Sequence, residues 1–131
     1  MATEEIELDL RKIVEKALDS DASHVPQHVL TKVDERITQA SKKNTSMDIE
    51  RYQKLAGKLE YFDLRELHDT ITNKALWIQF EPQFVNKEAL NTKFDQLAEL
   101  RNGIRHSRAV SEIVCKEGEA AILWFRKVLR K

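Results

Sequence analysis

The sequence predicts a compact, all-α, up-and-down bundle of about five or six helices. Three glycines and two prolines leave few residues that end helices or make turns, and 34% of the 131 residues are charged. The apolar residues come singly or in pairs, at the spacing of an amphipathic helix. A chain of this length holds one domain of ordinary size, so we expect a single helical domain over residues 4–131.

Two helices are expected in the first part of the chain. The first covers residues 4–19, and its apolar stripe consists of Ile6, Leu10, Ile13, Val14, Ala17 and Leu18. A polar break over residues 20–24 follows, and Pro26 suits the first turn of a second helix. The apolar stripe of that helix consists of Val29, Leu30, Val33 and Ile37. The apolar pattern fades over residues 39–44, which are expected to form a loop.

The middle of the chain carries two further helix starts. Thr45 and Asp48 have capping-box spacing, which predicts a third helix through residues 49–59, although Gly57 weakens its end. Asp63 and Glu66 repeat this spacing, so a fourth helix begins there and continues toward residue 80. Pro82 is expected to end or bend that helix.

Two helices with capping residues complete the chain. Asn86 is expected to cap a fifth helix, whose inward stripe is Leu90, Phe94, Leu97 and Leu100. Ser111 is expected to cap a last helix, whose inward residues are Val114, Ala121, Ile122, Phe125, Val128 and Leu129.

The balance of charge argues against a protein that coats nucleic acid. The 22 basic and 22 acidic side chains give a formal net charge of zero, so a site for an anionic ligand has to be local. The single cysteine, Cys115, is expected to be a partly buried thiol in a reducing compartment. No apolar run approaches the roughly 20 residues of a membrane span, and the acidic N-terminus is unlike a signal peptide. We therefore expect a cytoplasmic protein, or a nuclear one in a eukaryote, with no membrane partner.

Arg101 interrupts the inward stripe of the fifth helix. Steps of four and three residues from Leu90 through Phe94 and Leu97 predict an apolar side chain where the sequence has this arginine. Because burial of an unpaired charge costs several kcal/mol, the guanidinium needs an anionic partner. Arg101 faces either a carboxylate of its own fold or a cleft that holds phosphate, and the sequence leaves both possibilities open.

Asn102 and His106 lie four residues apart and therefore share one face of a helix, where the amide can fix the orientation of the imidazole. Arg101 is five residues before His106, which separates the two by roughly 140° around a helix. They converge only if the helix distorts at Gly103 or if a second copy of the chain completes the site. The spacing therefore indicates a groove shared by a two-fold homodimer.

An arginine and a histidine in one groove suit the cleavage of RNA, because RNA carries its own nucleophile in the 2′-hydroxyl and no metal is needed. Histidine can transfer a proton near neutral pH, and arginine can stabilise negative charge on the phosphate in the transition state. Arg105 and Arg108 add positive charge, and residues 101–108 contain no acid. This segment is the best candidate for binding phosphate.

The stretch from Leu97 to Arg108 resembles the motif of the HEPN superfamily, in which an arginine, often followed by an asparagine, precedes a histidine by five positions. Residues 10–13, 25–26, 59–64, 77–84, 110–112 and 118–124 resemble other parts of one branch of that superfamily. This branch occurs at the C-terminal end of a yeast nuclear RNA quality-control endonuclease and in prokaryotic conflict-system proteins. The resemblance covers nearly the whole chain, and the motif is its specific part.

The resemblance implies a short helical bundle, commonly dimeric, that cuts RNA without a metal or other cofactor. By position, it makes Arg101 and His106 the catalytic pair and Asn102 the polar residue that supports them. It also implies a role in RNA quality control or in toxin-like defence against phage or stress. In the toxin branch that is neutralised by nucleotidylylation, a tyrosine follows the histidine by two positions; this chain has Arg108 there, so that regulation is not implied.

Other candidate residues have simpler explanations. His24 and His28 lie on either side of Pro26 without a nearby cysteine or acid, so no metal site is expected. His68 is interpreted as a partly exposed, salt-paired histidine rather than an auxiliary residue of the groove. Three aromatic residues at helical spacing are interpreted as core or dimer contacts rather than a base-stacking surface: Trp77, Phe80 and Phe84.

Two functions remain open at this point. The first is a metal-independent endoribonuclease that acts as a homodimer, with His106 as general acid or base, Arg101 as phosphate clamp and Asn102 as the orienting residue. Arg105 and Arg108 would then bind the RNA. The second is a non-catalytic module that binds RNA, a nucleotide or a protein, within a larger parent protein or with a regulatory partner. In that case Arg101 is mainly a buried anchor.

Overall fold

A computed structural model describes residues 2–105 and 110–130. Within these two ranges the chain forms seven α-helices and two short 3-10 helices, and no strand. In chain order these are α1 (Ala2–Ala17), η1 (Ala22–His24), α2 (Gln27–Lys43), η2 (Ile49–Gln53), α3 (Leu55–Leu59), α4 (Leu64–Ile71), α5 (Trp77–Phe84), α6 (Lys87–Arg105) and α7 (Glu112–Leu129). The compact all-α fold predicted from the sequence is confirmed.

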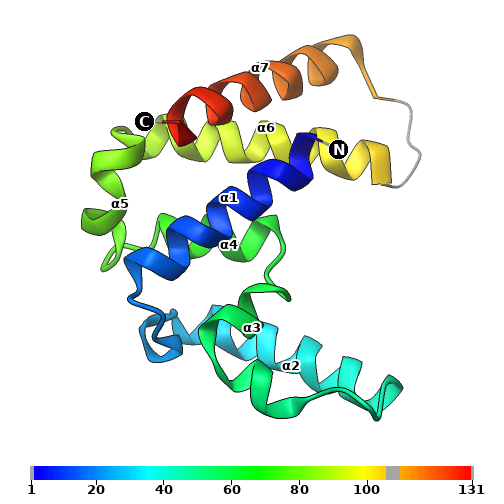
Figure 1. Cartoon of the computed structure of the whole chain (residues 1–131). Helices are drawn as coiled ribbons and strands as arrows, with labels where there is room; N and C mark the ends of the chain where they lie inside the picture. The colour runs from blue at the N-terminus through cyan, green and yellow to red at the C-terminus, as the bar shows by residue number, and fades with distance from the viewer. Residues whose placement is uncertain (1, 106–109, 131) are drawn as a thin grey trace.

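Helix α1 is central to the arrangement. It packs against α3, α4 and α7, while α2 and α3 lie on the opposite side of it from α7 (Figure 1). Leu10 and Val14 are fully buried on its inward stripe. Because neighbouring helices cover the apolar stripe of α1, this first amphipathic helix lies in the middle of the molecule.

Helix α2 is longer than expected. Its buried residues Val29, Val33 and Ile37 match the predicted stripe, but the helix continues to Lys43. The prediction of a loop over residues 39–44 was therefore wrong. Residues in this stretch are mostly exposed and include strong helix formers, so the helix extends into solvent without needing an apolar face.

The single helix predicted over residues 49–59 is divided into η2 and α3. The cap of the first of them is Asp48 rather than Thr45, because the Asp48 side chain accepts a hydrogen bond from the Glu50 amide. Gly57 is buried, and the carbonyl oxygen of Arg51 occupies the space where a Cβ of residue 57 would lie. This close approach brings η2 back against α3, which a continuous helix does not allow.

The predicted fourth helix is also divided. Its start is confirmed, since Asp63 and Glu66 form the capping box at the beginning of α4. Helix α4 ends at Ile71, and α5 then begins at Trp77. Pro82 lies inside α5, which ends two residues later at Phe84, so it accompanies the end of that helix rather than interrupting it at position 82.

Helices α6 and α7 form a long antiparallel hairpin along one side of the molecule (Figure 1). Both predicted caps are confirmed. Asn86 Oδ1 accepts a hydrogen bond from the Ala89 amide at 2.9 Å, and Ser111 Oγ accepts one from the Val114 amide at 3.2 Å. The hairpin places the end of α6, which carries the start of the motif, beside the beginning of α1 (Figure 1).

The buried aromatic residues belong to this core. Phe80 and Phe84 are 1% and 2% exposed, which confirms their interpretation as core residues. Trp77 is half-buried and packs against the edge of the core. Its indole nitrogen donates a hydrogen bond to Glu81 Oε2 at 3.3 Å.

Candidate functional site

Arg101 lies near the end of α6 with its side chain only 15% exposed. Its Nη2 atom is 3.1 Å from Oε1 of Glu7, a residue of α1 whose side chain is 7% exposed. The same nitrogen is 3.8 Å from Oδ1 of Asp63, at the start of α4. Of the two possibilities that the sequence left open, the carboxylate of the same fold is therefore present.

Arg101 also borders a cavity, which we call the α4–α6 cavity. Its volume is about 260 Å³, and it is lined by Asp63, Leu64, Arg65, His68, Phe94, Asp95, Ala98, Arg101 and Asn102. Asn102 is exposed, whereas the side chain of Arg101 is mostly buried where it lines the cavity. The first two residues of the motif therefore open on the same space.

His68 lies on the opposite wall of this cavity, on α4. Its ring stacks on that of Phe94, with centroids 4.4 Å apart and an angle of 14° between the planes. Its Nε2 atom is 2.6 Å from Oδ1 of Asn91. Because a carboxamide oxygen only accepts hydrogen bonds, this contact places a hydrogen on Nε2.

His68 is partly exposed, as the sequence predicts, but the predicted salt pair is absent among the described residues. The ring nitrogen pairs with an amide of α6 instead of Glu66 or Asp69. Glu66 is engaged by Arg36, and Asp69 lies 3.4 Å from Arg65 Nε. The stacked partner explains the difference, because it draws the imidazole toward α6 and away from the acids of its own helix.

Three arginines from three helices hold the chain segment just before α4, and sequence reasoning missed this cluster. Arg11 of α1 donates a hydrogen bond to the Phe62 carbonyl at 2.9 Å, and Arg36 of α2 donates one to the Tyr61 carbonyl at 3.1 Å. Arg101 approaches from α6. Only the third stood out in the sequence, because it alone interrupts an apolar stripe.

Arg36 is the most strongly engaged of these arginines. It makes a two-pronged contact with the carboxylate of Glu66, which is almost completely buried, and Nη2 is 4.0 Å from Oδ2 of Asp63. The hydrogen bonds to Glu66 raise the pKa of Arg36 above its ordinary value. Asp63 therefore links two arginines, one on each side of the segment, and fixes the wall of the α4–α6 cavity.

The formal charges of the residues that line the cavity cancel, if His68 is neutral. Its lining contains the cations Arg65 and Arg101 and the carboxylates Asp63 and Asp95. Both ion pairs of Arg101 use Nη2, and a guanidinium has further N–H donors on Nη1 and Nε. A phosphate in this cavity would therefore be bound by directed hydrogen bonds rather than by a strong positive field.

The remaining predicted site residues lie at the edge of the described part or beyond it. His106 and Arg108 are outside the described residues, and so is the side chain of Arg105, the last residue of α6. Gly103 is buried against Val110, whose Cγ2 atom occupies the space that a Cβ at position 103 would need. The last turn of α6 is thus packed against the residue at which the second described range begins.

In the described ranges, residues 2–105 and 110–130, no cluster of three or more His, Cys, Asp or Glu side chains has the geometry to hold a metal ion. None of the helices described is long and apolar enough to cross a membrane. Cys115 is half-buried as expected, and its Sγ lies 3.6 Å from Oε1 of Glu119.

Comparison of the chain with known protein families, with curated proteins and with solved structures finds no match. The fold by itself defines the class: this is a compact all-helical protein. At the end of α6 it has an arginine–asparagine pair that opens on a polar cavity.

Proposed function

We propose that the protein is a metal-independent endoribonuclease of HEPN type that cleaves RNA at a groove containing Arg101, Asn102 and His106. The observation that carries this proposal is the position of Arg101 and Asn102 on one cavity, with the histidine of the motif four residues beyond Asn102. The resemblance of residues 97–108 to the HEPN motif supports the same assignment. Its cellular context is proposed to be RNA quality control or defence.

In the proposed reaction the 2′-oxygen of a ribose attacks the adjacent phosphorus. The O2′–P bond forms and the P–O5′ bond breaks, which gives a 2′,3′-cyclic phosphate and a free 5′-hydroxyl. His106 accepts the proton of the 2′-hydroxyl or returns one to the leaving oxygen. Arg101 stabilises the added charge on the phosphate oxygens through its Nη1 and Nε donors while Glu7 holds Nη2.

Asn102 and the basic side chains complete the proposed site. Asn102 is exposed, and on a continuing helix it shares a face with His106, where its amide can orient the imidazole. Arg105 and Arg108 are proposed to bind the RNA backbone. None of these roles requires a cofactor.

The site is proposed to be shared between two copies of the chain. A continuous helix would separate Arg101 and His106 by roughly 140° around its axis, so a second copy would be needed to bring an arginine and a histidine together. Two large apolar side chains near the Glu7–Arg101 pair support this arrangement: Leu8 is 53% exposed and Ile104 is 48% exposed. Exposed apolar residues beside a polar site suit the edge of a dimer interface.

The test is incubation of the purified protein with end-labelled structured and unstructured RNA in EDTA. We expect the protein to cleave RNA, and both Arg101→Ala and His106→Ala to reduce the rate by a factor on the order of 100 or more. Matched controls are His24→Ala and Arg51→Ala, which remove an exposed histidine and an exposed arginine elsewhere. Cleavage that survives both Arg101→Ala and His106→Ala would contradict the assignment of a HEPN-type nuclease.

A second candidate function is a non-catalytic module that binds RNA, a nucleotide or a protein within a larger protein. The observation that favours it is the pair formed by Arg101 and Glu7, because an arginine held by a buried carboxylate is also explained by stability alone. This candidate predicts no RNA cleavage at any protein concentration. It also predicts that Arg101→Ala and Arg101→Lys differ in folding stability, while His106→Ala leaves binding unchanged.

A further inference from the structure

We propose that a basic groove along α2 binds the phosphates of an RNA strand that continues to the α4–α6 cavity. This inference rests on the proposed function, since it takes RNA as the ligand. We call the site the α2 groove: it has a volume of about 680 Å³ and is lined by Lys32, Glu35, Arg36, Gln39, Ala40 and Lys43. It contains three cations and one carboxylate in a chain whose net charge is zero.

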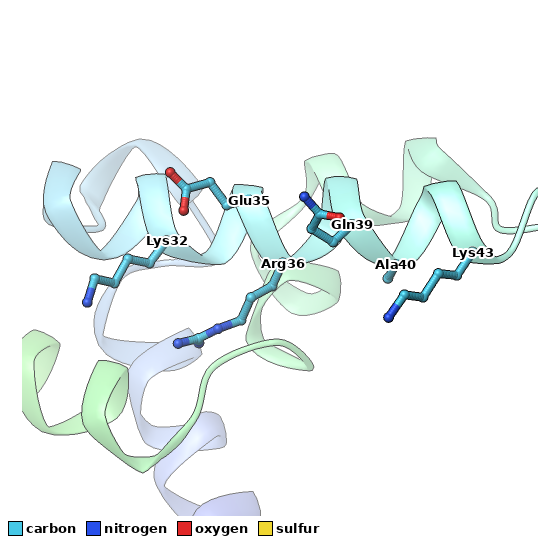
Figure 2. Close-up of a pocket in the computed structure, with 6 residues that line it drawn as sticks. All are labelled: Lys32, Glu35, Arg36, Gln39, Ala40 and Lys43. Carbon is cyan, nitrogen blue, oxygen red and sulfur yellow. The ribbon is translucent and has the colours of Figure 1, made fainter.

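The cations of the α2 groove share one face of the helix. Figure 2 shows the side chains of Lys32, Arg36 and Lys43 extending to the same side of α2, whereas Glu35 points away from them. The short side chain of Ala40 lies between the last two cations and leaves the groove open there (Figure 2). Lys32, Arg36, Ala40 and Lys43 follow one another at intervals of four, four and three residues, which is the spacing of a continuous stripe along one face of a helix.

The two lysines are available for a ligand, whereas the arginine is not. Lys32 and Lys43 are exposed, and neither makes an ion pair within the described residues. Arg36 is committed to Glu66 and to the Tyr61 carbonyl. We therefore assign phosphate binding to the lysines and a supporting role to Arg36.

The other flank of α2 has the opposite character. The cavity on that side, of about 390 Å³, is lined by Gln27, Thr31, Asp34, Glu35, Thr38 and Gln39. It has two carboxylates and no cation among its lining residues. Glu35 lines both cavities, and Asp34 is paired with Lys58 at 2.5 Å, so the two cations of these cavities that lack an ion pair among the described residues, Lys32 and Lys43, line the α2 groove.

No residue lines both the α2 groove and the α4–α6 cavity, but a third cavity shares one lining residue with each of them. Lys32 also lines a neighbouring cavity of about 490 Å³ between α2 and α4, and Arg65 lines both that cavity and the α4–α6 cavity. The carboxylates along this route, Glu66 and Asp69, lie against Arg36 and Arg65 respectively. A strand bound at Lys43 and Lys32 would therefore pass Arg65 and reach Arg101.

The length of the α2 groove sets the size of the bound segment. Lys32 and Lys43 are eleven residues apart, which is about 16 Å along a helix. At roughly 3.4 Å per nucleotide of a stacked strand, this corresponds to about five nucleotides. A single-stranded RNA of about twelve nucleotides, more than twice this estimate, is long enough to extend beyond the α2 groove.

The experiment measures binding of a fluorescent 2′-O-methyl RNA of that length to the full chain, by anisotropy, over a range of salt concentrations. This RNA lacks the 2′-hydroxyl nucleophile, so binding is measured without cleavage. For Lys32→Gln with Lys43→Gln we expect a Kd at least roughly tenfold weaker at 50 mM salt, and a plot of log K against log salt about 1.4 units shallower. The matched control is Lys42→Gln with Lys74→Gln, which removes the same charge from exposed positions outside the α2 groove.

The proposal is overturned if both double variants weaken binding equally, if neither does, or if the unaltered chain does not bind at low salt. Its failure is distinguishable from failure of the proposed function. If RNA cleavage depends on His106 but binding is insensitive to Lys32 and Lys43, only the proposal that the α2 groove binds RNA is contradicted. If binding depends on the two lysines but ordinary RNA is not cleaved, only the proposed nuclease function is contradicted.

Discussion

At the residue scale, Arg101 links the stability of the fold to the proposed chemistry. Its Nη2 atom faces the carboxylate of Glu7, which the fold has largely removed from water. Its side chain also lines the α4–α6 cavity, where a phosphate is proposed to bind. A change at this position therefore affects folding and any phosphate binding together, and the two effects have to be measured separately.

The first prediction concerns the stability of this pair. Arg101→Ala should lower the free energy of unfolding by roughly 3 kcal/mol, because it removes the guanidinium that faces a buried carboxylate. Replacing the carboxylate as well, with Glu7→Leu, should recover part of that loss, since no buried charge then has to be compensated. Urea unfolding followed by far-UV circular dichroism measures both variants. Arg101→Ala with the stability of the unaltered protein would show that the pair contributes nothing.

The sequence reveals the unusual residue of the site, but not the residues that contact it. The unusual position of Arg101 was visible, because it alone breaks an apolar stripe. Its partner Glu7 was not, since it belongs to a helix at the other end of the chain and has no distinguishing neighbour in the sequence. The environment of His68 was also hidden, because it depends on which residues of α6 face α4.

At the scale of elements, the packing of α6 against α7 positions the motif. A Cβ added to Gly118 of α7 would lie 2.6 Å from the Cβ of Leu100, which is a closer approach than a methyl group tolerates. The glycine therefore sets how closely the two helices approach one turn before the end of α6.

The second prediction follows from this contact. Gly118→Ala should lower the free energy of unfolding by roughly 1–2 kcal/mol, because the strain of overpacking exceeds the gain in helix propensity. Lys116→Ala, at an exposed position of the same helix, serves as the control for propensity. Thermal unfolding of the two variants gives the comparison. A Gly118→Ala variant more stable than the unaltered chain would contradict the close packing of α6 and α7.

The elements that the sequence predicted well are those with local signals. The capping residues Asp63, Asn86 and Ser111 mark the starts of α4, α6 and α7, because a cap acts on backbone amides within its own turn. The region around Gly57 was predicted as one helix, although it contains two short ones. Its geometry depends on contact between the Arg51 carbonyl and the glycine, which periodicity does not reveal.

At the scale of the whole molecule, the proposed nuclease requires two copies of the chain. The exposed Ile104 follows Arg101 by about one turn of α6. We expect the protein to have twice the mass of one chain by light scattering coupled to size exclusion. Ile104→Glu should shift it toward the monomer, since a charge at an apolar interface is costly to desolvate.

The control for this third prediction is Ile78→Glu, at an apolar residue of α5 that is 75% exposed. This variant should leave the mass unchanged and should fold as the unaltered chain does. A monomer for the unaltered protein at micromolar concentration would contradict the shared groove.

The chemistry of the RNA ends tests the central claim most directly. A substrate with one ordinary ribose in an otherwise 2′-O-methyl strand, incubated with the protein in EDTA, should be cut only after that ribose. The products should carry a 2′,3′-cyclic phosphate and a 5′-hydroxyl, and His106→Ala should abolish them. Cleavage at 2′-O-methyl positions, products with a 5′-phosphate, or an undiminished rate for His106→Ala would contradict the proposed mechanism.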